Sequence, residues 1–274
     1  MKATFMLLFI CLATNLFAAK VDTIEVYSTS MDKMIKNVVI TPSQQTDKKQ
    51  KHPLLFLLHG AGGNYTTWIK SVPELKKYAD QYGIIIVCPD GKSTSWYFDS
   101  PIDTTMRYKT YINKELYTHI TTHYPIHPAA KMHAISGLSM GGHGAMYAAI
   151  HFPKQWGVAG CLSGGVDFRP FPDSWEIKKR LGNYAENKAE WDKQVVINLV
   201  DSIKPNTLKI TIDCGVDDFF LAGNRALHTK LQALNIPHDY SERPGNHNWT
   251  YWRNAIKYQM IFFDTCFKAG GYNQ

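Results

Sequence analysis

Residues 131–151 read KMHAISGLSMGGHGAMYAAIH, and this stretch decides the fold. Residues 131–135 are predicted to form a buried strand, and residues 142–151 are predicted to form a helix. Between them, Gly137-Leu138-Ser139-Met140-Gly141 forms a Gly-x-Ser-x-Gly motif in the strand–turn–helix context that this motif requires. The two glycines leave room for a tight, strained turn, and Gly142 lets the helix pack closely. We therefore predict that Ser139 projects its hydroxyl from the end of the strand as a nucleophile.

Strand and helix patterns alternate along the rest of the chain. Further strands are predicted over 21–27, 34–40, 53–58, 84–88, 158–162, 209–214 and 238–243, and further helices over 74–82, 107–124, 221–234 and 249–267. This alternation predicts an α/β fold with a mostly parallel sheet, helices on both faces and an antiparallel N-terminal hairpin. Residues 167–204 interrupt the pattern, so this insertion is either a cap over a pocket or a plain connecting segment.

A serine hydroxyl is a weak nucleophile unless a base accepts its proton and an acid orients that base. His247 is the predicted base because it follows the last predicted strand and precedes the last helix. Two acids, Asp217 and Asp218, follow the strand over 209–214. Of these, Asp218 is the predicted partner because it directly precedes an apolar run.

A glycine-rich turn, residues 59–64 (HGAGGN), ends the predicted strand over 53–58. Its glycines allow backbone N–H groups to point into a cavity, so the N–H groups of Ala61 and Met140 are the predicted donors to an oxyanion. A phosphate-binding loop would continue with Gly-Lys-Ser or Gly-Lys-Thr, which is absent here. His59 and His143 are expected near the site in a structural role.

Aromatic and acidic residues near the same sheet edge are candidates for substrate binding. Trp96 and Asp99 follow the strand over 84–88 and are predicted at the pocket mouth, either as a wall for an acyl or sugar group or as core packing. Trp249 follows the predicted base at the start of the last helix and is a third candidate. We predict no metal or other cofactor, since His119 and His123, four apart on a helix, have no third ligand nearby.

Length and composition favour one globular domain over residues 20–274. The chain has 274 residues, of which 45% are hydrophobic and 19% charged, which excludes a disordered chain. The formal net charge of +7 is spread thinly, so no nucleic-acid partner is predicted.

Residues 1–19 have the pattern of a secretory signal peptide. Lys2 precedes an apolar run over 3–12 that is too short for a permanent membrane span, and small residues follow at 18 and 19. The bulky Ile10 disfavours lipid modification of Cys11. We expect the mature protein to be exported to the periplasm or the medium, without a membrane partner. Its cysteines are either buried free thiols or disulfide partners: Cys88, Cys161, Cys214 and Cys266.

These motifs resemble the esterase D-like branch of the α/β-hydrolases. The resemblance rests on residues 57–64, 96–101, 137–145, 213–219 and 245–249 and covers about residues 30–268. The order of serine, acid and histidine is also that of the α/β-hydrolases. The family includes tributyrin, feruloyl and acetyl-xylan esterases, S-formylglutathione hydrolases and mycolyl-transferring enzymes. The resemblance implies Ser139 as nucleophile, Asp218 and His247 as its partners, and Ala61 and Met140 as oxyanion donors. The oxyanion loops of S-formylglutathione hydrolases carry a cysteine, whereas this loop has Ala-Gly-Gly.

The sequence thus predicts an exported serine carboxylesterase that works through an acyl-enzyme. The resemblance and the export signal favour short acyl esters or acetyl and feruloyl esters on polysaccharides. Three alternatives stay open: an acyltransferase to a sugar hydroxyl, a non-catalytic carbohydrate-binding protein on the same scaffold, and a peptidase.

Overall fold

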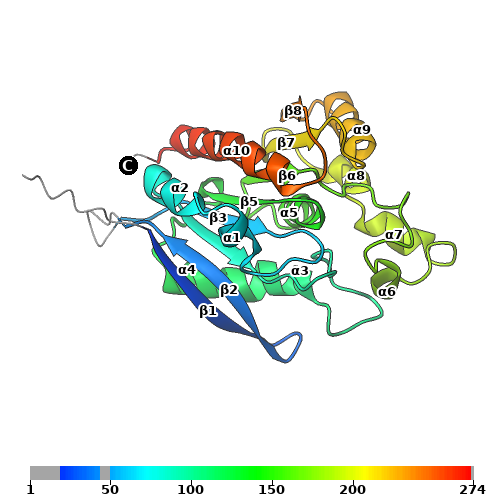
Figure 1. Cartoon of the computed structure of the whole chain (residues 1–274), viewed down its shortest axis with the longest axis horizontal. Helices are drawn as coiled ribbons and strands as arrows, with labels where there is room; N and C mark the ends of the chain where they lie inside the picture. The colour runs from blue at the N-terminus through cyan, green and yellow to red at the C-terminus, as the bar shows by residue number, and fades with distance from the viewer. Residues whose placement is uncertain (1–18, 44–49, 273–274) are drawn as a thin grey trace, which may run out of the picture.

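The computed structural model describes residues 19–43 and 50–272, which build one eight-stranded sheet with helices on both faces (Figure 1). The strand order is β1-β2-β4-β3-β5-β6-β7-β8. The strands are β1 (Lys20–Ser28), β2 (Lys33–Thr41), β3 (Leu54–Leu58), β4 (Ile85–Pro89), β5 (His133–Gly137), β6 (Val158–Leu162), β7 (Lys209–Gly215) and β8 (Asp239–Arg243). Strands β1 and β2 form an antiparallel hairpin and β2 pairs antiparallel with β4, whereas all other pairs are parallel. The predicted fold is confirmed.

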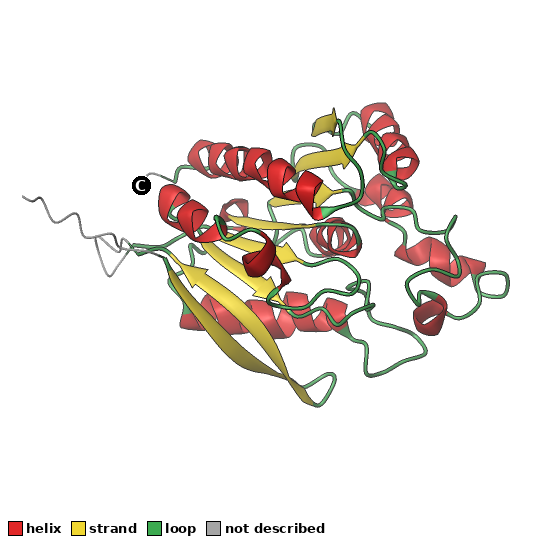
Figure 2. Cartoon of the chain, viewed as in Figure 1, coloured by secondary structure: helices red, strands yellow, loops and turns green. Residues whose placement is uncertain are grey.

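The predicted helical ranges all contain helix, with small shifts at their ends, and a further short helix over Thr67–Ser71 was not predicted (Figure 2). They are α1 (Thr67–Ser71), α2 (Leu75–Tyr82), α3 (Tyr108–Thr110), α4 (Tyr117–His123), α5 (Met140–His151), α6 (Lys178–Leu181), α7 (Lys188–Gln194), α8 (Val196–Leu199), α9 (Leu221–Ala233) and α10 (Trp249–Ala269). A π-helical segment, η1 (Tyr111–Leu116), joins α3 to α4, and short 3-10 turns occur at η2 (Ala130–Met132) and η3 (Val200–Ser202). Because η2 precedes it, β5 begins at His133 and not at residue 131, and α5 begins at Met140, two residues earlier than predicted.

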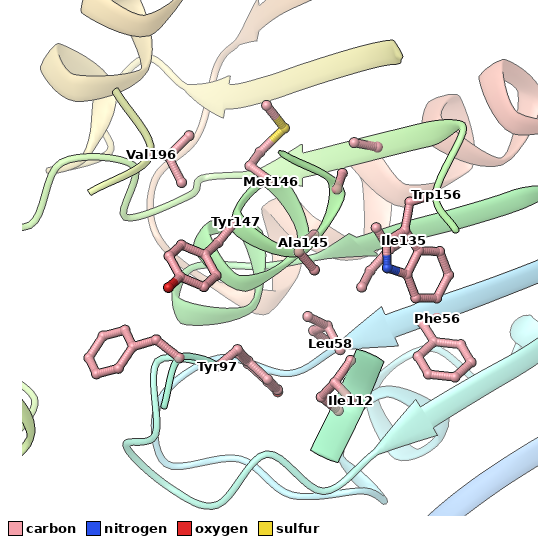
Figure 3. Close-up of a cluster of buried hydrophobic side chains, with 14 of the residues drawn as sticks. Phe56, Leu58, Tyr97, Ile112, Ile135, Ala145, Met146, Tyr147, Trp156 and Val196 are labelled. Carbon is pink, nitrogen blue, oxygen red and sulfur yellow. The ribbon is translucent and has the colours of Figure 1, made fainter. Parts of the chain in front are cut away.

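Two apolar layers sandwich the sheet. On one face α1, α2 and α10 cover residues such as Leu55 and Leu57. On the other face, the segment from α3 to α4 packs with α5 against Phe56, Leu58 and Ile135 (Figure 3). Strands β3, β4, β5 and β6 are buried along their whole length, which explains why their sequences are short apolar runs without alternation.

The parallel strands bring their carboxyl ends to one edge of the sheet, where ligands bind in open α/β sheets. The loops after β3, β5, β7 and β8 all begin at this edge. The insertion over 167–204 follows β6 and contains the short helices α6, α7, α8 and the turn η3.

The four cysteines within the described ranges are free: Cys88, Cys161 and Cys214 are buried and Cys266 is half-buried. Burial raises the pKa of the Cys88 and Cys161 thiols to about 12. None of the helices in the described part of the chain is both long and apolar enough to span a bilayer. The predicted signal peptide falls almost wholly outside the described residues.

Candidate active site

Ser139 lies on a strained turn between β5 and α5. Its backbone has φ 56° and ψ −119°, a region that a non-glycine residue adopts only under constraint. Two backbone hydrogen bonds hold this conformation: the Ser139 N–H donates to Leu162 O at 2.9 Å, and the Ser139 carbonyl accepts from Gly165 N at 3.2 Å. The following residue begins a twelve-residue helix, whose N-terminus favours negative charge near the hydroxyl.

The two glycines of the motif are required by close backbone contacts. A Cβ on Gly137 would lie 2.5 Å from the carbonyl carbon of Gly141, and one on Gly141 would lie 2.7 Å from His59 O and closer still to Leu58 O. These neighbours are backbone atoms, so they cannot rotate away. The expectation that only small residues fit here agrees with this packing.

His247, in the loop after β8, lies between Ser139 after β5 and Asp218 after β7. Its Nε2 lies 2.9 Å from Ser139 Oγ, and its Nδ1 lies 2.8 Å and 3.0 Å from the two carboxylate oxygens of Asp218. The Asp218 side chain has no exposed surface, and it also accepts a hydrogen bond from Phe220 N at 2.8 Å. The structure thus brings the three predicted residues into one hydrogen-bonded chain.

The neighbouring acids are placed elsewhere. Asp217 is exposed, and its backbone N–H donates to Gly245 O at 2.9 Å. Asp213 lies buried within β7, where it pairs with Arg243 and accepts a hydrogen bond from the Tyr251 hydroxyl. Because β8 and α10 flank the loop that carries His247, this buried pair ties both ends of that loop to β7.

The loop over 59–64 presents unoccupied backbone donors beside Ser139. Among the described residues, the N–H groups of Ala61 and Met140 have no hydrogen-bond acceptor, although the neighbouring Gly62 and Gly63 N–H groups each have one. Free N–H groups next to a nucleophile are the donors that an oxyanion needs. The predicted pair of donors is therefore free for that purpose.

His59 fixes this loop as a neutral imidazole. Its Nε2 accepts from Gly91 N at 2.9 Å, so its Nδ1 is the nitrogen that donates to Gly60 O at 2.8 Å. Burial lowers the pKa of His59, which agrees with this neutral pattern. The structural role expected for His59 follows from these contacts.

Ser139 and His247 line a cavity of about 300 Å³. Its walls come from residues 60–63 and from the aromatic side chains Trp175, Trp249 and Trp252. The Phe219 ring packs 4.2 Å from the His247 ring, and the Trp252 ring meets it edge-on at 4.8 Å. The base therefore lies against aromatic surface, with only 13% of its side chain exposed.

Two of the three substrate-binding candidates do not line this cavity. Trp96 is 1% exposed and packs edge-on against Phe168 at 4.9 Å and His143 at 5.5 Å, so the core-packing alternative holds for it. Asp99 accepts two hydrogen bonds from Thr110 and so fixes the start of the helical segment from α3. Placing either residue at the pocket mouth is therefore wrong, whereas Trp249 lies in the cavity wall, and its part in substrate binding stays a prediction.

Two side chains that shape the cavity are not among the predicted residues. Trp175 lies in the insertion, and its indole lines the cavity. Trp252 lies one helical turn after Trp249 on α10, so the i, i+3 spacing was a usable signal.

Comparison with known proteins places the chain in a family. A sequence profile of the family described as "Putative esterase" matches residues 28–263. The chain belongs to this esterase family. An acetyl esterase of Caldicellulosiruptor saccharolyticus is 26% identical over 252 residues, which cover 85% of this chain and 94% of that protein. The diacylglycerol acyltransferase/mycolyltransferase Ag85A of Mycobacterium gordonae is 27% identical, covering 75% of this chain and 70% of that protein.

A solved ferulic acid esterase superposes on this esterase with a TM-score of 0.78. It is 24% identical, and the match covers 92% of this chain and 99% of that one. At this identity the likeness shows a shared fold. Together with the family match, it identifies the protein as an esterase with the serine-hydrolase fold, in agreement with the resemblance found in the sequence.

Proposed function

We propose that the protein is an exported serine carboxylesterase in which Ser139, His247 and Asp218 form the catalytic triad. The observation that carries the proposal is the continuous chain of contacts from the hydroxyl through the imidazole to the buried carboxylate, at 2.9 Å and 2.8 Å, beside a cavity that Ser139 and His247 line. This is the geometry that nucleophilic acyl transfer requires.

Acylation follows from this geometry. Ser139 Oγ attacks the ester carbonyl carbon while its proton moves to His247 Nε2, and the carbonyl oxygen becomes an oxyanion between the Ala61 and Met140 N–H groups. The bond from carbon to the alcohol oxygen then breaks, and the imidazolium returns its proton to the departing alcohol. Asp218 holds the imidazole in the tautomer that accepts at Nε2 and stabilises the imidazolium.

Deacylation repeats these steps with water. His247 takes a proton from water, whose oxygen attacks the acyl carbon of the ester on Ser139. The bond to Oγ breaks and the proton returns to the serine, so that the acid leaves and the enzyme is restored.

For substrates, we propose short acyl esters or acetyl and feruloyl esters carried by polysaccharides. Support comes from the acetyl esterase relative and the ferulic acid esterase neighbour. The proposed export rests on residues 1–19 of the sequence. Amino-terminal sequencing of the protein from the extracytoplasmic fraction tests it, and a retained Met1 there would contradict cleavage.

Hydrolysis of p-nitrophenyl acetate by Ser139→Ala tests the mechanism. We expect kcat to fall by about 10⁴-fold or more, while the melting temperature stays near that of the wild type. Ser202→Ala, at an exposed serine of η3, is the matched control and should behave as wild type. If Ser139→Ala cleaves the ester at the native rate, the mechanism is wrong. Labelling of the wild type by a fluorophosphonate distinguishes an enzyme from a non-catalytic binding protein.

An acyltransferase is the second candidate, and the Ag85A relative favours it. The chemistry differs only in the second step, where a sugar hydroxyl would replace water. Product analysis with a sugar acceptor separates the two, because transfer gives an acylated sugar at the expense of the free acid. A peptidase would instead digest casein.

A further inference from the structure

The insertion between β6 and β7 supplies one side chain to the catalytic cavity. The Trp175 indole lines the same cavity as Ser139 and His247. It stacks on Phe219, with ring centroids 5.7 Å apart and an interplanar angle of 21°, and it rests on Phe220 at 5.3 Å. Trp175 is therefore supported by aromatic rings while part of its surface faces the cavity.

The backbone at this position is strained. Trp175 and Glu176 have φ values of 47° and 56°, although bulky side chains avoid this left-handed region. Two such residues in sequence persist only where surrounding contacts determine the conformation, and such strain clusters at active sites and ligand clamps.

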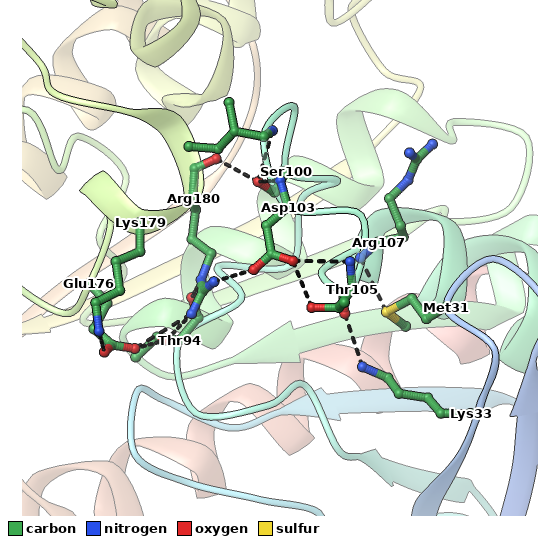
Figure 4. A network of polar contacts seen from close by, with 11 residues as sticks. Met31, Lys33, Thr94, Ser100, Asp103, Thr105, Arg107, Glu176, Lys179 and Arg180 are labelled. Carbon is green, nitrogen blue, oxygen red and sulfur yellow. Dashed lines mark hydrogen bonds and ion pairs between the residues drawn. The ribbon is translucent and has the colours of Figure 1, made fainter.

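Polar contacts of Glu176 and Arg180 supply that constraint (Figure 4). The Glu176 carboxylate accepts from Thr94 Oγ1 at 2.8 Å and pairs with Arg180 at 3.5 Å. Arg180, whose side chain is 9% exposed, donates to Asp103 at 2.6 Å and to Thr94 O at 3.3 Å. Thr94 and Asp103 belong to the loop after β4, so these bonds fasten the insertion to the body of the molecule.

We infer that Trp175, held by Glu176 and Arg180, forms an acyl subsite that selects flat aromatic acyl groups over aliphatic ones. The inference rests on the proposed function, because the acyl group is the part of the ester that stays bound to Ser139 in this cavity. At about 300 Å³, the cavity is at the small end for organic ligands, and apart from the His247 imidazole the aromatic rings in its wall are indoles. Indole surfaces favour planar aromatic partners through offset or edge-on stacking beyond simple burial.

Two methyl esters with the same alcohol test this subsite: methyl cinnamate and methyl butyrate. We expect the wild type to favour cinnamate in kcat/KM. Trp175→Ala should lower the cinnamate-to-butyrate ratio about tenfold or more, because stacking and aromatic burial are both lost. Trp175→Phe should restore much of the ratio, because a flat ring returns. Trp191→Phe, a fully buried tryptophan of the same insertion that does not line the cavity, is the matched control and should leave the ratio unchanged.

The outcomes separate this inference from the proposed function. An equal loss on both esters in Trp175→Ala, or no change in the ratio, would overturn the subsite. So would a wild-type enzyme that cleaves butyrate but not cinnamate, although the esterase mechanism would then stand. Native cleavage of methyl butyrate by Ser139→Ala would instead overturn the mechanism. Fluorophosphonate labelling of Trp175→Ala at the wild-type rate shows that the variant is folded and its serine reactive.

Discussion

The catalytic cavity has two sides that are built in different ways. One side is the sheet edge, where Ser139, Asp218 and His247 follow the ends of β5, β7 and β8. Their positions are set by backbone hydrogen bonds between strands and by backbone packing at the glycines. The other side is the insertion, where Trp175 packs on Phe219 and Phe220 and side-chain ion pairs of Arg180 hold the turn that follows it.

The two sides therefore suit two different tasks, catalysis and selection between substrates. Backbone contacts hold the reacting atoms at fixed distances and tolerate little change, which suits chemistry common to a family. Side-chain contacts can be exchanged one at a time without disturbing the sheet, which suits selectivity between substrates. Changes at the sheet edge should therefore abolish catalysis, whereas changes in the insertion should redirect it.

The largest effect is expected from replacing Asp218, the acid at the sheet edge. Asp218→Asn keeps the shape but removes the charge that orients and stabilises the His247 imidazolium, so kcat should fall roughly 10⁴-fold, as in other triads. Asp217→Asn changes the exposed neighbour and is the matched control, with activity near wild type. Steady-state kinetics on p-nitrophenyl acetate measure both. A loss in Asp217→Asn equal to that in Asp218→Asn would contradict the assignment.

The glycines test whether backbone packing holds the sheet edge. Gly141→Ala forces a Cβ against the carbonyl oxygens of Leu58 and His59, so we expect the free energy of unfolding to fall by about 3 kcal/mol, with loss of activity as Ser139 shifts. Gly223→Ala in α9 is the matched control, because its Cβ would have no neighbour nearer than 3.7 Å. That variant should be stabilised by about 0.5–1 kcal/mol. Urea unfolding measures both, and an unaffected Gly141→Ala would show that the turn can relax.

The same difference explains what the sequence predicted. The turn at Ser139 follows from local residue types, because only glycine fits at 137 and 141. The parallel sheet then brings Asp218 and His247 to the same edge, so their places after predicted strands, together with the apolar run after Asp218, were enough to predict them. These features depend on the backbone, which local sequence patterns determine.

The cavity wall could not be predicted in this way. Trp96 and Trp175 are both aromatic residues in irregular segments, and each has a positive φ that redirects the chain. Trp96 turns into the core beside His143, whereas Trp175 lines the cavity. Which way such a residue points depends on long-range partners, such as the bonds from Arg180 to the loop after β4. Local sequence carries no signal for those partners.

His143 joins the two sides, and its burial should make the folded chain less stable in acid. It lies on α5 and contacts Gln194 O of the insertion at 2.8 Å and Trp96 O at 3.0 Å. Burial lowers the pKa of His143 from 6.5 to about 4, against the opposing effect of the two carbonyls. The unfolded chain thus binds this proton first, and stability present above pH 6.5 is lost as the pH falls towards 4, by about 1.4 kcal/mol per pH unit.

Urea unfolding between pH 7 and pH 5 measures this loss in wild type and in His143→Gln. Most carboxylates stay ionised in this range, and the other histidines contribute equally to both proteins. The variant should be less stable at pH 7 but should have a flatter pH dependence. Identical slopes in the two proteins would show that His143 is not the group that makes the protein sensitive to acid.

The smallest effect is expected from changing Arg180, which fastens the insertion to the loop after β4. Arg180→Lys keeps the charge but not the planar fork that reaches Asp103, Thr94 and Glu176 together, so Trp175 should lose part of its fixed orientation. We expect the cinnamate-to-butyrate ratio to fall about threefold, less than in Trp175→Ala, because the indole is displaced and not removed. Arg169→Lys is the matched control, since that arginine pairs with Asp167 and Asp192 in the same insertion and should leave the ratio unchanged. An equal change in both variants would mean that any loosening of the insertion alters selectivity, and that the contacts of Arg180 have no special part in placing the wall.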